Sequence, residues 1–264
     1  MCRAYSGGRW SSRPMPGAIR PWTGPCPCCA RSWPSGAARP CRRTRSAAGC
    51  TNWAMSGSGR ATSCRRTPSA RKKRLICRRV RQLPERAVVL AADETDLRLF
   101  PPLRARWAER GEPAPVPISG ANAKRVVFGA LNLRTGTRLL LARQRQCGAD
   151  FRLFLDRVRG CWRGWHIALL LDEDSSHTAG YSQEWAAALG IELLWLPKRS
   201  PHLNPLDHLW RHAKQRVCAN RQYEGIDEEV ERFLDYLAGV SNTEALLKAG
   251  VLSEDFWLKD ALCH

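Results

Sequence analysis

Five short apolar runs constrain most strongly how this chain can fold. Their length and β-forming side chains predict strands, and the RTG turn around Gly136 predicts a hairpin between the second and the third. The fourth run, HIALLLDED, is almost wholly apolar before its acids, as expected for a central strand covered on both faces. The runs lie at residues 87–93, 124–133, 137–144, 166–174 and 191–197.

Amphipathic segments follow the third strand and alternate with the remaining ones. They predict helices at residues 149–162, 181–190, 204–220 and 228–239. The third of these begins with Asn204 as N-cap and Pro205 as its first residue. The order β-β-β-α-β-α-β-α predicts an α/β fold, with three antiparallel strands followed by alternating helix and strand in a mixed sheet that has helices on both faces.

Charge is divided unevenly along the chain. A net charge of +19 on its own suggests a protein that binds nucleic acid. However, residues 1–84 contain 19 of the 43 Lys and Arg and no Asp or Glu, so the remaining 24 basic residues share residues 85–264 with all 24 acids. The part that contains the predicted strands is therefore formally neutral.

Residues 1–70 have the composition of a segment that cannot bury a core. Arg, Ser, Pro, Gly, Ala, Cys and Trp dominate, with no period of 2 or 3.6, and disorder is the ordinary interpretation. The Trp and Cys content and the lack of acids also fit translation of a GC-rich gene in the wrong frame, because the codons from Trp53 onward allow Gly-Tyr-Glu-Trp and a basic linker in another frame. We therefore interpret residues 1–84 as a disordered segment or a frameshifted remnant of a DNA-binding module, with the correct frame resuming between about Arg71 and Leu83. Residues 85–264 are the expected folded domain.

Cysteine use and hydropathy predict a cytoplasmic protein. Eight of the 12 cysteines lie in residues 1–84, but without any His or paired CxxC units, so we expect no zinc site there. The first ten residues lack the apolar core of a signal peptide, and no run reaches the roughly 18 apolar residues of a membrane helix. A soluble protein with free thiols in a reducing compartment is expected.

Three acids occupy related places in this predicted order. Asp93 ends the first strand, Asp172 follows the fourth, and Asp207 lies in the first turn of the helix after the fifth. Strand ends that lie side by side would bring these carboxylates together, where they would repel one another unless a cation such as Mg²⁺ or Mn²⁺ lay between them. A pair of such ions about 4 Å apart would support phosphoryl transfer at a phosphodiester.

Each acid also has a purely structural interpretation. Acids at strand ends are common loop residues. Asp207 is the third residue of its helix, where a carboxylate caps backbone N–H groups and favours the helix dipole. The residues alone leave both interpretations open.

Six ordered blocks give the chain a family resemblance. The chain resembles the DDE transposases of the mariner-like superfamily and, within it, the bacterial insertion-sequence (IS) six-thirty group, over roughly residues 85–258. Asp172 and Asp207 are separated by 34 residues, the interval that this superfamily uses between its second and third acids. The blocks are ADETDLRLFP, RWAERG, FGALN, LLLDEDSSH, LWLPKRSPHLNPLDHLW and RHAKQRV.

The resemblance implies a ribonuclease-H-like fold, with residues 85–264 as a DDE-type catalytic domain. It implies that Asp93, Asp172 and Asp207 are the catalytic triad and bind two divalent ions, usually Mg²⁺ and alternatively Mn²⁺. In the family these ions activate water to cut DNA at transposon ends, and then activate the liberated 3′-hydroxyl to join target DNA. The chain departs from the family where Glu173 and Asp174 replace the usual Asn and Ala, and where the third acid is Asp although Glu is commoner in the bacterial branch.

Neighbours of the triad have several interpretations. Glu94 and Asp96 stay outside it, because strand alternation turns Glu94 away from Asp93. His177 orients a carboxylate or contacts DNA, unless it is simply packed or solvent-facing. Trp107 and Trp210 are interpreted as core or interface aromatics.

Basic residues flank the third acid. Phosphate contact is the functional interpretation and ordinary solvated charge the structural one. The candidate DNA-binding residues are Lys198, Arg199, Arg211, Lys214 and Arg216, together with His177.

By this resemblance the chain is a transposase of a bacterial insertion sequence. Its partners would be the terminal inverted repeats and target DNA, bound by a homodimer in the nucleoid, with no membrane. An inactive or truncated remnant that at most binds DNA, or a related ribonuclease-H-like nuclease without joining activity, are the alternatives. A complete triad favours retained chemistry, whereas the lack of an in-frame helix-turn-helix module favours the remnant.

Overall fold

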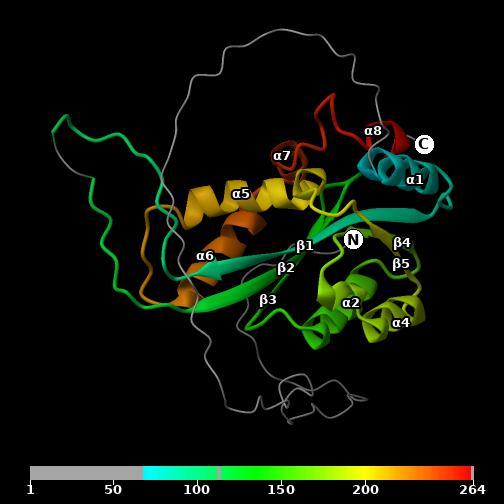
Figure 1. Ribbon diagram of the computed structural model, residues 1–264, viewed down its shortest axis with the longest axis horizontal. Helices are drawn as coiled ribbons and strands as arrows, with labels where there is room; N and C mark the ends of the chain where they lie inside the picture. Colours follow the sequence, from blue (N-terminus) through cyan, green and yellow to red (C-terminus); the bar gives the residue numbers. More distant parts are fainter. Residues whose placement is uncertain (1–67, 112–113, 263–264) are drawn as a thin grey trace, which may run out of the picture. The chain divides into compact units, whose positions relative to one another are not determined.

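A five-stranded mixed sheet organises the part of the chain that the computed structural model describes, residues 68–111 and 114–262 (Figure 1). The strand order is β3-β2-β1-β4-β5. β1 pairs antiparallel with β2 and β2 with β3, while β4 is parallel to β1 and β5 is parallel to β4, which confirms the predicted mixed sheet. The strands are β1 (Ala87–Arg98), β2 (Lys124–Asn132), β3 (Arg138–Arg143), β4 (His166–Leu171) and β5 (Ile191–Trp195).

β1 is longer than its apolar pattern predicts. The prediction that Asp93 ends the strand is wrong, because residues 93–98 continue to pair with β2, from Asp93 opposite Gly129 to Arg98 opposite Lys124. The pairing of β1 with β4 ends earlier, at Ala91 opposite Leu170. Asp93 therefore lies at the level where β1 extends past β4.

Helices cover both faces of the sheet, as predicted (Figure 1). The four predicted helices correspond to α2 (Gly148–Cys161), α4 (Gly180–Ala188), α5 (Pro205–Val217) and α6 (Ile226–Gly239). Among the described residues, no helix combines the length and apolar content that crossing a bilayer requires. The unpredicted elements are α1 (Pro68–Arg81), α3 (Ser175–Thr178), the 3-10 turn η2 (Pro201–Leu203), α7 (Asn242–Lys248) and α8 (Lys259–Leu262).

Strand alternation divides the buried side chains into two cores. On β1, Val89 and Ala91 belong to the core that α5, α6 and α7 cover, hereafter the α5-side core. Leu90 and Ala92 point the other way, into the core that contains Phe151 and Phe154 of α2. Because neighbouring strand residues alternate between faces, odd-numbered side chains of β1 point toward α5 and even-numbered ones toward α2.

α1 lies before the expected domain boundary at residues 84 and 85 but packs into the same unit. Ile76 and Val80 are buried in the α5-side core. Arg79 forms an ion pair with Glu192 of β5, with Nε 2.5 Å from Oε1. The packed unit thus begins before residue 85. The expectations for residues 1–67, disorder or a frameshifted remnant, lie outside the described residues.

The two tryptophans weighed in the sequence have different environments. Trp210 is 2% exposed and packs in the α5-side core, as interpreted. Trp107 is fully exposed on the segment between β1 and β2, so the core interpretation is wrong for it.

Gly129 allows α5 to lie close to the sheet beside Asp93. A Cβ atom at this position would stand 2.5 Å from the Trp210 ring and 3.0 Å from the Leu206 side chain. Because both side chains are buried, neither can move away freely. Close approach of α5 therefore depends on the glycine.

Gly129→Val is expected to lower the free energy of unfolding by about 1–3 kcal/mol, the usual effect of overpacking a filled core. Denaturant unfolding monitored by circular dichroism measures it. Gly160→Ala in α2 is the matched control, since a Cβ there meets nothing within 4 Å. Equal stability of the two variants would contradict the packing described here.

Candidate active site

The sheet register brings Asp93 and Asp172 to the same level. Ala91 of β1 lies opposite Leu170 of β4 in the parallel pair, and each acid follows two residues later. Ala91 and Leu170 both belong to the α5-side core, and alternation along β1 places Asp93 on the same face. Asp172 directly follows Leu171, the last residue of β4.

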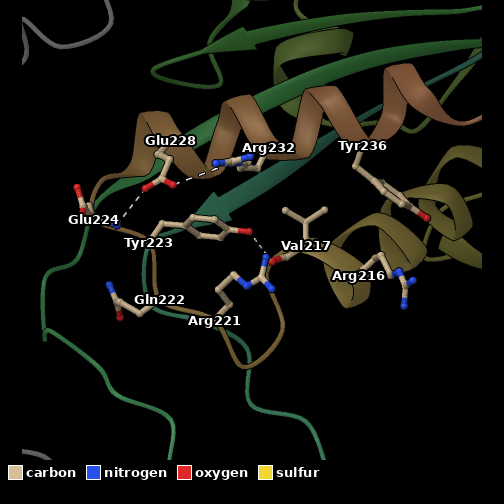
Figure 2. A pocket seen from close by; sticks show the side chains of 9 residues that line it. All are labelled: Arg216, Val217, Arg221, Gln222, Tyr223, Glu224, Glu228, Arg232 and Tyr236. Carbon is tan, nitrogen blue, oxygen red and sulfur yellow. Dashed lines mark hydrogen bonds and ion pairs between the residues drawn. The ribbon is translucent and has the colours of Figure 1, made fainter.

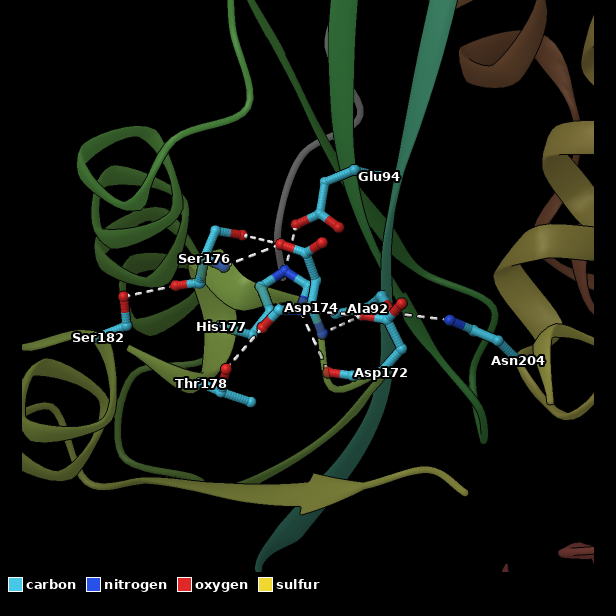
Figure 3. A network of polar contacts seen from close by, with 9 residues as sticks. All are labelled: Ala92, Glu94, Asp172, Asp174, Ser176, His177, Thr178, Ser182 and Asn204. Carbon is cyan, nitrogen blue, oxygen red and sulfur yellow. Dashed lines mark hydrogen bonds and ion pairs between the residues drawn. The ribbon is translucent and has the colours of Figure 1, made fainter. Parts of the chain in front are cut away.

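Asn204 fixes the start of α5 against β1. Its side-chain oxygen accepts a hydrogen bond from the Leu206 backbone N–H at 3.1 Å, and its Nδ2 donates to the Ala92 carbonyl at 2.9 Å (Figure 3). Pro205 follows as the first helical residue, which confirms the predicted helix start. Since Ala92 precedes Asp93, this clamp ties the first turn of α5, with Asp207, to the strand that carries Asp93.

The three acids interact electrostatically. The pKa of Asp93 is raised well above its usual range, first by burial and then by the negative charges of Glu94, Asp172 and Asp207. Such repulsion is what a bound cation relieves, and carboxylate oxygens are the ligands that Mg²⁺ and Mn²⁺ prefer. The donor chemistry therefore fits a divalent metal.

The side chains are not gathered into a ligand shell. In the described part of the chain, no group of three Asp, Glu, His or Cys stands close enough to enclose an ion. Asp172 instead pairs with His177 at 3.0 Å, and Asp207 pairs with Arg211 at 2.7 Å. Holding a metal among the three acids would require these carboxylates to turn toward Asp93.

His177 connects Asp172 to Glu94 (Figure 3). The imidazole is 1% exposed and packs against the Phe151 ring. Its Nδ1 lies 3.0 Å from Asp172 Oδ1, and its Nε2 lies 2.7 Å from Glu94 Oε1. Burial alone lowers the pKa of His177, but hydrogen bonds to Asp172 and Glu94 and their charges raise it to about 10, so the ring is a double donor at neutral pH.

This network holds one oxygen of Asp172 in place. The hydrogen bond from His177 is the main cause that lowers the pKa of Asp172, which stays ionised. Oδ1 also accepts from the Asp174 backbone N–H at 3.3 Å. The Asp172 side chain is still 59% exposed, so its orientation is fixed on one side while the other side stays open.

The network corrects two interpretations of the sequence. The assignment of His177 as a DNA contact is wrong in this fold, because the ring is buried and both of its nitrogens are occupied. Glu94 points away from Asp93, as strand alternation predicts. However, its side chain is only 8% exposed and pairs with His177, which in turn holds Asp172. The sequence signal that could have indicated this role is the even-numbered position of Glu94 on β1, which places its side chain on the face of the sheet that α2 covers.

The two acids that depart from the family pattern have their own partners. Glu173 forms ion pairs with Lys72 of α1 and, at 3.3 Å, with Lys198. Asp174 is the N-cap of α3 and accepts from the Ser176 N–H at 2.8 Å. The extra negative charge beside Asp172 is therefore largely compensated.

The predicted DNA-binding cations occupy different environments. Lys198 and Arg199 are exposed on the segment after β5, and Arg199 has a positive φ of 54°. Arg211 is exposed and paired with Asp207. Lys214 is half-buried, and burial lowers its pKa, with partial compensation from negative charges that include those of Asp93 and Asp207. Among these cations, Arg211 contacts one of the three acids directly, and Lys198 contacts Glu173, the neighbour of Asp172.

Arg216 lies apart from the acids. It is exposed in the last turn of α5, about 13 Å along the helix axis from Asp207 at 1.5 Å per residue. There it lines an open pocket of about 620 Å³ between the end of α5 and α6, together with Tyr223 and Arg232 (Figure 2). None of the three acids lines this pocket, so we do not assign the reaction to it.

Asn204→Ala is expected to destabilise the fold by about 1–3 kcal/mol, since it removes a helix cap and leaves the buried Ala92 carbonyl without its donor. Because Asp207 loses its fixed position, the DNA cleavage that the family resemblance implies for the acids should fall as well. Thermal unfolding and a DNA cleavage assay measure the two effects. Ser241→Ala is the control: it removes the cap of α7, which accepts from the Glu244 N–H at 3.2 Å, and should leave cleavage unchanged. Equal losses of cleavage in both variants would refute the role of the clamp.

The sequence of residues 88–228, more than half of the chain, matches the family described as DDE superfamily endonuclease. The chain belongs to the DDE superfamily endonucleases. This membership confirms the resemblance, and the matched segment contains all three acids.

Two relatives illustrate the similarity of this DDE superfamily endonuclease to transposable-element proteins. It is 26% identical over 155 residues to the insertion element IS630 uncharacterized 39 kDa protein of Shigella sonnei, covering 58% of this chain and 45% of that protein. It is 41% identical over 46 residues, 17% of each chain, to the transposable element Tcb2 transposase of Caenorhabditis briggsae. The chain thus spans less than half the length of the first of these relatives.

Solved structures confirm the ribonuclease-H-like fold. The Mos1 transposase paired-end complex with left transposon end has a TM-score of 0.57 at 18% identity, covering 78% of this chain and 66% of that one. The catalytic domain of Mos1 mariner transposase has a TM-score of 0.50 at 16% identity, covering 72% of this chain and 90% of that domain. The DDE superfamily endonuclease therefore has the architecture that its strand order predicts.

Proposed function

We propose that the chain contains the catalytic domain of an insertion-sequence transposase, which cuts DNA at transposon ends and joins them to target DNA. One observation carries the proposal: Asp93 on β1, Asp172 after β4 and Asp207 on α5 lie near enough for the charges of Asp172 and Asp207 to raise the pKa of Asp93. The relatives support the substrate class, since Tcb2 is named a transposase and Mos1 is described in complex with a transposon end. Intact acids with compensated neighbours favour active chemistry over an inactive remnant.

Metal dependence is part of the proposal. Mos1 paired-end complexes are described with Mg and with Mn. A pair of Mg²⁺ or Mn²⁺ ions held by Asp93, Asp172 and Asp207 would activate the attacking oxygen and stabilise the leaving oxygen at a phosphodiester.

The residues of the chain have distinct tasks in this reaction. Asp93 is the ligand on the paired strand β1, opposite Gly129 of β2. Asp172 presents its open side while His177 holds Oδ1. Lys214 on α5, whose charge interacts with those of Asp93 and Asp207, offsets negative charge where the DNA phosphate approaches. Lys198, Arg199 and Arg211 bind phosphates around the site, and a homodimer on paired DNA ends is the proposed assembly.

Incubating the full chain with a supercoiled plasmid that carries the terminal inverted repeats of its own element tests the function. We expect nicked and linear plasmid in the presence of Mg²⁺ or Mn²⁺, with breaks at the repeats, and intact plasmid after chelation with EDTA. An intact plasmid with both metals would contradict the proposal, and so would cleavage that EDTA does not stop.

A further inference from the structure

The outward face of α1 carries a row of arginines that the acid site does not use. Arg71, Arg74, Arg78 and Arg81, hereafter the arginine face, are all exposed. Spacings of three, four and three residues place them on one side of the helix. α1 contains no acid, and within the described part of the chain these four side chains have neither an ion pair nor a hydrogen bond.

Other basic residues of α1 fix how the helix is oriented. Lys72 forms an ion pair with Glu173, and Arg79 pairs with Glu192 through two hydrogen bonds of 2.5 and 2.8 Å. Ile76 and Val80 pack into the core. The helix is thus held from its inward side, and the arginine face is directed outward as a fixed row.

An unpaired arginine row is unfavourable for an isolated domain. Arg71 with Arg74, Arg74 with Arg78, and Arg78 with Arg81 are like-charge neighbours on one helix side, and such neighbours destabilise helices. An ordinary solvated helix relieves this with interspersed acids, which α1 lacks. A polyanion bound along the row would supply the missing negative charge.

Lys72, the residue after Arg71, contacts the neighbour of a candidate catalytic acid. Glu173 directly follows Asp172 and forms an ion pair with Lys72 of α1. Lys198 contacts the Glu173 carboxylate as well, at 3.3 Å. Basic side chains of α1 and of the segment after β5 therefore meet at the residue next to a candidate catalytic acid. From Arg71 to Arg81 the row extends about 15 Å at 1.5 Å per residue, enough for several phosphates of a B-DNA strand, which are about 3.4 Å apart along the axis.

We propose that the arginine face of α1 binds the phosphate backbone of the DNA duplex that flanks the cleaved bond. The inference rests on the proposed function for the identity of the polyanion. Contacts of this kind position DNA without reading its sequence.

A salt titration tests the inference with the full chain and a fluorescent 30-base-pair duplex of arbitrary sequence. Replacing all four arginines by glutamine should reduce the slope of log K against log salt by about 0.9 for each phosphate that the variant no longer neutralises, and affinity at 100 mM NaCl should fall at least about tenfold. The matched control replaces four exposed arginines elsewhere by glutamine and should change both quantities much less. The control positions are Arg145, Arg157, Arg163 and Arg221.

Lysine at the same four positions distinguishes a charge effect from misfolding. The lysine variant should keep nearly the wild-type slope, and circular dichroism should show equal helix content in all variants. The inference is overturned if the α1 glutamine variant binds DNA as the control variant does, or if the lysine variant loses binding equally. Normal salt-dependent binding without any cleavage would refute the proposed transposase activity and leave the arginine face supported.

Discussion

Asp93→Asn is expected to lower the rate of Mg²⁺-dependent DNA cleavage by about a thousandfold or more, corresponding to a loss of roughly 4 kcal/mol of transition-state stabilisation. Burial is the main cause that raises the pKa of Asp93, and the charges of Glu94, Asp172 and Asp207 raise it further. The amide keeps the size of the side chain but is a neutral and much weaker ligand. Single-turnover cleavage of end-containing DNA measures the rate.

Stability separates this effect from misfolding. The pKa of Asp93 is raised in the fold, so in a metal-free buffer its ionised form opposes folding. The stability that Asp93 itself contributes is fully present below its unfolded pKa near 3.8 and is lost as pH rises through the raised pKa. Asp93→Asn should therefore be at least as stable as the wild type at pH 7. Asp235→Asn, an exposed acid on α6, is the control and should cleave normally. An Asp93→Asn variant that cuts DNA at the wild-type rate would exclude Asp93 from the site.

His177→Ala is expected to affect both stability and catalysis. It leaves Glu94 buried without its partner, and removing one member of a buried charge pair typically costs about 3–5 kcal/mol. It also frees Oδ1 of Asp172, and the loss of such an outer hydrogen bond typically lowers metal affinity or activity about 10–100-fold. Cleavage rates across a Mg²⁺ titration should show a higher half-saturating concentration.

Two further variants make this result specific. Glu94→Gln keeps an acceptor for His177 but removes its charge, so a smaller change in the same direction is expected. His212→Ala, on the exposed side of α5, should change nothing. A wild-type Mg²⁺ dependence in folded His177→Ala would show that the network does not position Asp172.

The strands and main helices follow from local periodicity, and for that reason the sequence predicts them well. HIALLL and IELLW are mostly apolar because side chains of β4 and β5 pack into the cores on both faces of the sheet. Asn204-Pro205 determines the start of α5 by capping chemistry alone. The extent of β1 is not encoded locally. Residues 93–98 contain three acids and resemble a strand end, yet their backbone pairs with β2, a segment more than 25 residues away in the sequence.

The three candidate acids can be predicted from the sequence, but the side chains that hold them in position cannot. Strand order makes Asp93, Asp172 and Asp207 candidate metal ligands, and the family resemblance, which includes the spacing between Asp172 and Asp207, favours them over the structural interpretations. The bond between Glu94 and His177 joins two residues 83 positions apart, on a strand face and a one-turn helix that meet only in the tertiary fold. A different reason applies to α1, which is not predicted because residues 1–84 are judged by their composition as a whole. Within them, α1 has a side with buried Ile76 and Val80 and a regular spacing of arginines.

Mn²⁺ binding, followed by the electron paramagnetic resonance signal of the free ion, tests most directly whether the three acids form one metal site. We predict saturable binding to the wild-type chain that is lost or severely weakened in Asp93→Asn, Asp172→Asn and Asp207→Asn alike, and retained in Asp235→Asn. Wild-type Mn²⁺ affinity in any of the three single variants would contradict a shared metal site.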